Sequence, residues 1–179
     1  MKHYQGQILS KDFMETIANQ GGFIDAKKGG LLLGNSHEFG GVIIVYQYGN
    51  DFEVMGEVEG WEFILNLESS VKYRKRIGDI NNIARDCYGD FREFKPSAST
   101  KIIDARSKPF HNKYILCDYR GGFAIINKYS TQKHIEELNI INAEGLAINN
   151  EEPYELNGLT LENFNEVKPK PWYKRIFRL

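Results

Sequence analysis

The stretch that decides the fold occurs twice in this chain, at residues 60–72 and again at residues 121–133: GWEFILNLESSVK and GGFAIINKYSTQK. Aligned without a gap, the two stretches share a glycine, an isoleucine, an asparagine, a serine and a lysine, and the match extends to Ile80-Asn81 and Ile141-Asn142. An internal repeat shows how a chain is assembled before any motif shows what it does. Two copies are too few for a solenoid, so we predict a duplicated unit inside one compact domain.

Each copy predicts the same local structure. A short apolar strand ends at an asparagine, Asn66 or Asn127, and a helix follows, for which we predict Ser69 or Ser130 as the N-cap. Apolar residues three apart give each helix a narrow buried stripe. We expect the first helix to run to about residue 84 and the second to about residue 142.

The remaining pattern predicts one further helix, at residues 11–19 with Ser10 as its N-cap, and several short strands. The strands are expected at residues 31–33, 41–48, 52–58, 61–65, 101–104 and 113–119. We therefore predict an α+β fold with a mostly antiparallel sheet and two repeat-related strand-turn-helix units, at about residues 60–81 and 121–142. One domain is expected over residues 1–145, followed by a loosely structured extension at 146–167 and a distinct tail at 168–179.

The composition predicts a folded globular protein and argues against several classes. The chain has 179 residues, of which 41% are hydrophobic and 13% aromatic, and its net charge of −1 gives no overall positive field for nucleic acid. The first residues lack the apolar run of a secretion signal, and no stretch approaches the length of a membrane span. We expect a soluble protein made in the cytoplasm, with Cys87 and Cys117 as buried free thiols.

The segment LGNSHEFGGV, residues 33–42, allows two interpretations. In the first, His37 acts as a base or metal ligand together with Glu38 or Glu62, because imidazole and carboxylates are ordinary zinc ligands. In the second, which we favour, Ser36, His37, Gly40 and Gly41 form a structural turn, as do Asn66 and Asn127. Adjacent residues of an extended segment point to opposite sides, so His37 and Glu38 are poorly placed to share one metal. We predict no metal and no cofactor.

The same segment, followed by EVEGWEFILN at residues 57–66, resembles a module of phage and mobile-element proteins, including structural and tape-measure-like proteins. The resemblance covers about residues 29–81, and the second copy, residues 120–142, keeps only the latter half of the pattern. Trp61 stands where the family pattern commonly has a glycine. The resemblance implies a place in a virion or another large assembly.

The C-terminal tail, KPKPWYKRIFRL, combines aromatic and basic residues and differs from everything before it. If it is helical, its apolar side chains lie together, as in segments that insert into a partner's groove or lie on an anionic membrane. We predict that it binds a protein partner, with docking back onto its own domain, and binding to membrane or nucleic acid, as alternatives. The predicted partner-binding residues are Trp172, Tyr173, Lys174, Arg175, Ile176 and Phe177.

These observations favour a non-catalytic assembly protein of a phage or mobile element that docks on a larger complex through its tail. One alternative is a metal-assisted hydrolase that uses His37 and nearby carboxylates. Another is a small inhibitor or immunity protein that binds a toxin or defence factor through Glu57, Glu59 and Glu62.

Overall fold

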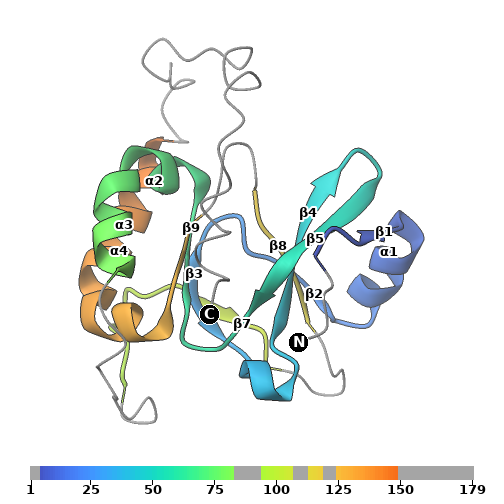
Figure 1. The fold of residues 1–179 in the computed structure, drawn as a ribbon, viewed down its shortest axis with the longest axis horizontal. Coiled ribbons are helices and arrows are strands. Elements are labelled where there is room, and N and C mark those ends of the chain that lie inside the picture. The colour runs from blue at the N-terminus through green and yellow to red at the C-terminus, as the bar shows by residue number, and fades with distance from the viewer. Residues whose placement is uncertain (1–4, 83–93, 107–112, 119–123, 149–179) are drawn as a thin grey trace.

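The chain folds into four layers, in the order helix, sheet, sheet, helix (Figure 1). The computed structural model describes residues 5–82, 94–106, 113–118 and 124–148. Sheet A contains, in spatial order, β1 (Ile8–Leu9), β5 (Asp51–Val58), β4 (Val42–Tyr48), β8 (Tyr114–Leu116) and β2 (Phe23–Asp25). Sheet B contains β7 (Ile102–Asp104), β3 (Gly30–Leu33), β6 (Phe63–Leu65) and β9 (Ala124–Ile126). The helices are α1 (Lys11–Asn19), the 3-10 turn η1 (His37–Phe39), α2 (Leu67–Lys72), α3 (Arg74–Asn81) and α4 (Lys128–Ile148).

The α+β class is confirmed, but the expectation of a mostly antiparallel sheet is wrong, because both sheets are mixed. In sheet A, β8 runs parallel to β4 and to β2, and in sheet B, β7 runs parallel to β3. Among the described strands, only β4 and β5 are joined by a tight hairpin turn, which forces an antiparallel pair. The chain reaches β7 and β8 after long connections, and these allow a strand to enter a sheet in either direction.

Alternating side chains divide the interior into three apolar cores. Leu32 and Ile64 of sheet B point toward sheet A and pack with residues such as Val42, whereas Leu31 and Phe63 point toward the helices. This alternation follows from the two-residue period of a strand, and it buries both faces of sheet B. Figure 1 shows α2, α3 and α4 on the outer face of sheet B and α1 on the outer face of sheet A.

The helices that follow β6 and β9 are each interrupted. Tyr73 has φ −105° and ψ 19° and separates α2 from α3, and His134 has φ −119° and ψ 20° within α4. The two interruptions come directly after Lys72 and Lys133, which are equivalent in the two aligned stretches. The first helical segment ends at Asn81, earlier than expected, and α4 continues to Ile148, beyond the expected end. None of the helices in the described ranges combines the length and the apolar character that crossing a bilayer requires.

Candidate functional site

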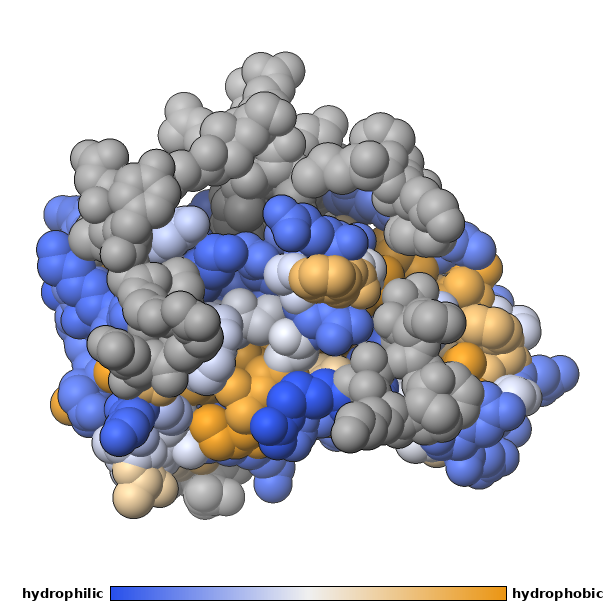
Figure 2. Space-filling model, turned by 90° about the horizontal axis from the view of Figure 1, so that it is seen from below, coloured by the Kyte–Doolittle hydropathy of each residue, from blue (hydrophilic) through white to orange (hydrophobic). Residues whose placement is uncertain are grey.

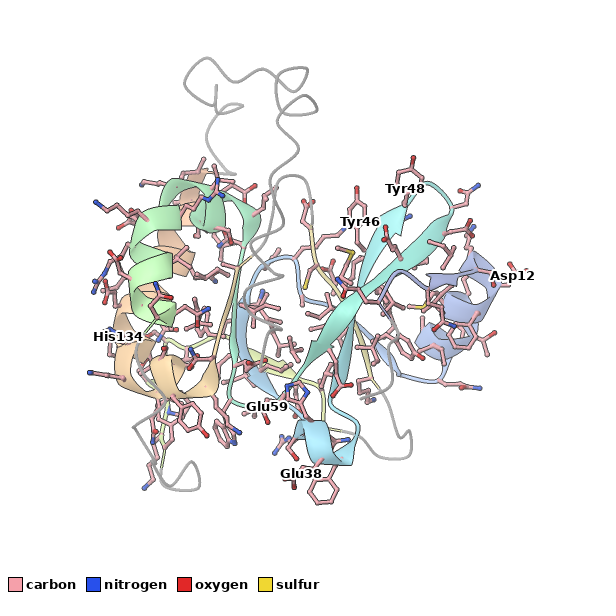
Figure 3. The ribbon with its side chains drawn as sticks, viewed as in Figure 1. Asp12, Glu38, Tyr46, Tyr48, Glu59 and His134 are labelled. Atoms are coloured by element: carbon pink, nitrogen blue, oxygen red, sulfur yellow. The ribbon has the colours of Figure 1, made fainter. Side chains whose placement is uncertain are left out.

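Residues 36–41 form a compact turn at the end of the molecule that carries η1 (Figure 3). The Phe39 and Gly41 amides both donate to the Ser36 carbonyl, at 2.9 and 3.0 Å. Gly40 and Gly41 have φ values of 89° and 52°, a region that residues with a side chain rarely adopt. The glycines therefore set the path of this turn.

His37 pairs with Glu57 and not with its neighbour Glu38. Its Nδ1 lies 2.7 Å from the Oε1 atom of Glu57 on β5, and Glu38 is on the exposed surface of η1 (Figure 3). A Cβ atom on Gly41 would lie 2.4 Å from the same Glu57 oxygen. Gly41 thus leaves the space in which the Glu57 carboxylate meets the imidazole.

A strained turn joins β5 to β6. Trp61 has φ 72°, and it is the one non-glycine residue with positive φ in the described part of the chain. Its amide donates to the Leu32 carbonyl at 2.8 Å, and its indole contacts the Phe94 ring edge to face, with 5.8 Å between ring centroids. Gly60 passes so close to Gly34 that a Cβ on Gly60 would lie 2.5 Å from the Gly34 carbonyl oxygen.

Glu62 lies inside this turn and is half-buried. Its Oε2 accepts a hydrogen bond from the Glu59 amide at 3.1 Å. Burial raises the pKa of Glu62 to about 7, and the nearby Glu59 charge adds to this, while the Glu59 amide and the charges of His37 and Lys128 act in the opposite direction. Lys128, the first residue of α4, pairs with the Glu59 carboxylate at 2.9 Å. We call His37, Glu57, Glu59, Glu62 and Lys128 the Glu62 cluster.

The Glu62 cluster has groups that can exchange protons, namely a carboxyl that titrates near neutral pH close to an imidazole. Within the described ranges, no three side chains of His, Cys, Asp or Glu converge in a way that could hold a metal ion. Glu57 and Glu59 are paired inside the molecule, so the acidic face expected of an inhibitor is partly neutralised. The face seen in Figure 2, which includes the η1 end, has small apolar areas scattered among hydrophilic ones.

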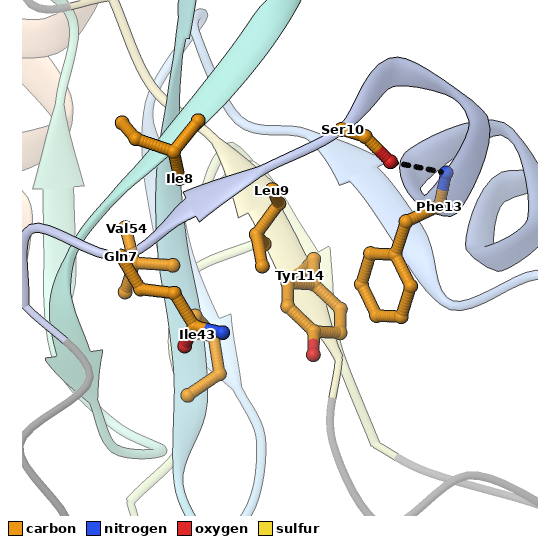
Figure 4. A pocket seen from close by; sticks show the side chains of 8 residues that line it. All are labelled: Gln7, Ile8, Leu9, Ser10, Phe13, Ile43, Val54 and Tyr114. Carbon is orange, nitrogen blue, oxygen red and sulfur yellow. Dashed lines mark hydrogen bonds between the residues drawn. The ribbon is translucent and has the colours of Figure 1, made fainter.

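Two hollows in the described surface lie away from the Glu62 cluster. The first, of about 410 Å³, lies between β1, α1 and the adjoining strands of sheet A (Figure 4). It is lined by Gln7, Ile8, Leu9, Ser10, Phe13, Ile43, Val54 and Tyr114. The second, of about 310 Å³, is lined by Lys27, Tyr46, Gln47, Gly49, Leu116, Cys117 and Asp118. Cys117 is a buried free thiol whose pKa is raised by burial, and Cys87 lies outside the described residues.

Asn66 caps α2 and also binds Asn142 in the interior of α4. Its Oδ1 accepts from the Ser69 amide at 2.9 Å, while its Nδ2 donates to the backbone carbonyl of Asn142 at 2.7 Å and to Oδ1 of Asn142 at 2.8 Å. The Asn66 amide also donates to Oδ1 of Asn142, at 2.9 Å, and the Ser69 hydroxyl donates to the Ile141 carbonyl at 2.6 Å.

Asn127 makes the equivalent set of bonds to Asn81. Its Oδ1 accepts from the Ser130 amide at 2.9 Å, and its Nδ2 donates to the carbonyl and Oδ1 of Asn81, at 3.2 and 2.8 Å. The Asn127 amide donates to Oδ1 of Asn81 at 2.9 Å, and the Ser130 hydroxyl donates to the Ile80 carbonyl at 2.8 Å. We call these two sets of bonds the asparagine clamps.

The prediction of Ser69 and Ser130 as N-caps is wrong, because the asparagines cap the helices. Each serine lies three residues further on, where its amide reaches the asparagine side chain and its hydroxyl reaches the partner helix. Asn81 and Asn142 were visible in the sequence as repeated residues, and that repetition was the signal for the clamps. Lys128 carried no comparable signal.

The predicted partner-binding residues of the tail lie outside the described part of the chain. No protein-family model, no curated protein and no solved structure matches this chain. The geometry of the described residues is therefore the basis for assigning a function.

Proposed function

We propose that this chain is a non-catalytic assembly protein, with a rigid folded part and a tail that docks on a larger complex. The observation that carries the proposal is the pair of asparagine clamps. The polar residues common to both stretches, Asn66 and Asn127 above all, are occupied by backbone groups of the same molecule. Side chains used in this way stabilise a scaffold and are not available to a substrate.

We further propose that residues 60–81 and 121–142 are duplicated scaffold units. In the antiparallel pair of β6 and β9, Ile64 lies directly opposite Ile125, its equivalent in the aligned stretch. The helix interruptions at Tyr73 and His134 also occupy equivalent positions. A duplicated scaffold keeps the residues that build it, whereas a duplicated active site would keep its reactive residues, and the second copy has no Ser-His-Glu segment.

Docking is assigned to the tail on the basis of its sequence. Tryptophan, tyrosine and arginine are the side chains that most often dominate the free energy of a protein interface, and Trp172, Tyr173 and Arg175 are of this kind. The association with a phage or mobile element comes from the sequence resemblance alone.

The test compares the full chain with a chain that ends at residue 167, in the cells that naturally produce it. After mild crosslinking, we expect the full chain in a particle much larger than 20.6 kDa and the shortened chain as a free monomer. The paired substitution Trp172→Ala with Phe177→Ala should act like the deletion, whereas Lys170→Ala should not. A shortened chain that stays in the particle would refute docking through the tail.

A second candidate is hydrolysis by proton transfer at the Glu62 cluster. It is favoured by the pairing of His37 with Glu57 beside a carboxyl whose pKa is about 7. Enzyme assays with ester, amide, glycoside and phosphodiester substrates, with and without Zn²⁺ or Mn²⁺, would detect it. Activity that disappears in His37→Ala, with unchanged stability, would rank this candidate first.

A further inference from the structure

The turn of residues 59–62 is held in a strained shape by a small number of bonds. Trp61 has φ 72°, a region that is unfavourable for a residue with a side chain. The shape is kept by three backbone bonds, namely Gly60 to Asn35, Trp61 to Leu32 and the Glu62 amide to the Glu59 carbonyl, the last at 3.4 Å. A fourth bond runs from the Glu59 amide to the Glu62 carboxyl. Only this fourth bond involves a group that gains or loses a proton.

Charged groups face Glu62 from three directions. Glu59 lies in the same turn, His37 lies on η1 and is paired with Glu57 of β5, and Lys128 lies at the start of α4. Strand β3, which packs on the turn, contributes the backbone of Leu32, whose amide donates to the Glu62 carbonyl at 2.8 Å. A charged Glu62 would therefore lie next to the Glu59 carboxylate in a half-buried position, where burial disfavours the charged form.

We propose that the turn of residues 59–62 is a proton-controlled latch, closed while the Glu62 carboxyl is neutral and released when it is charged. A neutral carboxyl still accepts the Glu59 amide bond through its carbonyl oxygen. The Glu59 amide bond itself favours the charged form, but burial disfavours that form more strongly, so a charged carboxyl lowers its free energy by rotating into water and then gives up that bond. Trp61 loses a restraint on its positive φ, and its indole moves away from Phe94.

Release of the latch occurs near neutral pH, because the pKa of Glu62 is raised to about 7. The aromatic surface of Trp61 and Phe94 is then covered at lower pH and accessible at higher pH. This property goes beyond the proposed assembly function, since it holds whatever the tail binds.

The experiment uses Trp61 as the reporter. The chain has two tryptophans, so Trp172→Phe leaves Trp61 as the single indole in an otherwise complete protein. We expect its emission to shift to longer wavelength, and its quenching by acrylamide to increase, as pH rises through about 7. Adding Glu62→Gln should hold both signals at their low-pH values throughout the range from about pH 5 to 9, and Glu38→Gln, an exposed carboxylate nearby, should change nothing.

Neighbouring charges give a second, independent set of outcomes. Glu59→Gln removes a like charge and should move the midpoint to lower pH, whereas Lys128→Met should move it to higher pH. Far-ultraviolet circular dichroism establishes that each variant is folded, and the Glu59 and Lys128 variants carry the test if Glu62→Gln does not fold. A signal that is constant with pH, a transition that survives in Glu62→Gln, or a transition lost in His37→Gln and retained in Glu62→Gln would each overturn the latch.

Discussion

Asn66 and Asn142 are joined by three hydrogen bonds although 76 residues separate them along the chain. Asn66 lies at the start of α2. Asn142 lies within α4, at the position where the sequence predicts the second helix to end. Asn127 and Asn81 repeat the arrangement over 46 residues. The two strand–helix segments consequently hold each other, and the polar atoms at their helix starts are satisfied from outside the segment.

Asn66→Ala should lower the free energy of unfolding by about 3 kcal/mol, because it removes a helix cap and both side-chain hydrogen bonds to the buried Asn142. Asn19→Ala, at the exposed end of α1, should change it by less than about 0.5 kcal/mol. Chemical denaturation of both variants measures the difference. Equal stabilities would mean that the clamp does not contribute to stability.

Gly145→Ala and Gly78→Ala should act in opposite directions, although both glycines lie in helices. A Cβ on Gly145 would lie 2.1 Å from the Ser69 hydroxyl and 2.3 Å from Oδ1 of Asn66, so alanine there should destabilise the fold. A Cβ on Gly78 has open space around it, and alanine should stabilise α3 by up to about 1 kcal/mol. Thermal melting compares the two, and a stabilising Gly145→Ala would contradict the close packing of α4 on the first clamp.

Glu62 should make the protein less stable as pH rises. Its pKa is about 7 in the folded chain and 4.5 ordinarily, so between these values the folded state keeps a proton that the unfolded state has lost. The stability that this provides is complete below about pH 4.5, decreases up to about pH 7, and amounts to roughly 3 kcal/mol at most.

Glu62→Gln should remove this dependence, so that the variant gains stability over the parent protein between pH 5 and pH 8. Urea denaturation at the two pH values gives the difference, and Glu38→Gln is the matched control. If the stabilities of the parent and of Glu62→Gln change in parallel with pH, the Glu62 carboxyl is not held neutral in the folded protein.

Trp61→Gly should be more stable than Trp61→Ala by about 1 kcal/mol. Both variants lose the contact with Phe94, but glycine adopts a φ of 72° without the strain that alanine incurs. At an ordinary strand or helix position, the alanine variant would be the more stable of the two. Denaturation of the pair decides the matter, because an alanine variant of greater stability would show that the turn relaxes once the indole is removed.

Local patterns in the sequence predicted local elements well. The helix at 11–19 is confirmed, and so are the strands that became β3, β4 and β5, since the helix and β5 show a clear period while β3 and β4 contain apolar runs preceded by glycine. β1 and β2, of two and three residues, were not predicted. The parallel pairs formed by β8 could not be predicted, because strand order depends on packing between distant segments.

The candidate site was predictable to a smaller extent. The sequence drew attention to His37, Glu62 and the repeated asparagines, but it did not show which residue each one contacts. Glu57 is twenty residues from His37, and it meets the imidazole only because the hairpin of β4 and β5 brings it back beside Gly41. The raised pKa of Glu62 likewise depends on burial between segments, which no local pattern records.

The clamps also determine when the fold can be completed during synthesis. When residues 1–82 have left the ribosome, α2 and its capping residue Asn66 are present. The Asn142 carbonyl and β9, which pairs with β6, have not yet been synthesised. Asn81 is equally without its partner, Asn127, at this stage. Both partners, Asn127 and Asn142, arrive within one short interval of translation, so a single late segment completes both clamps at once.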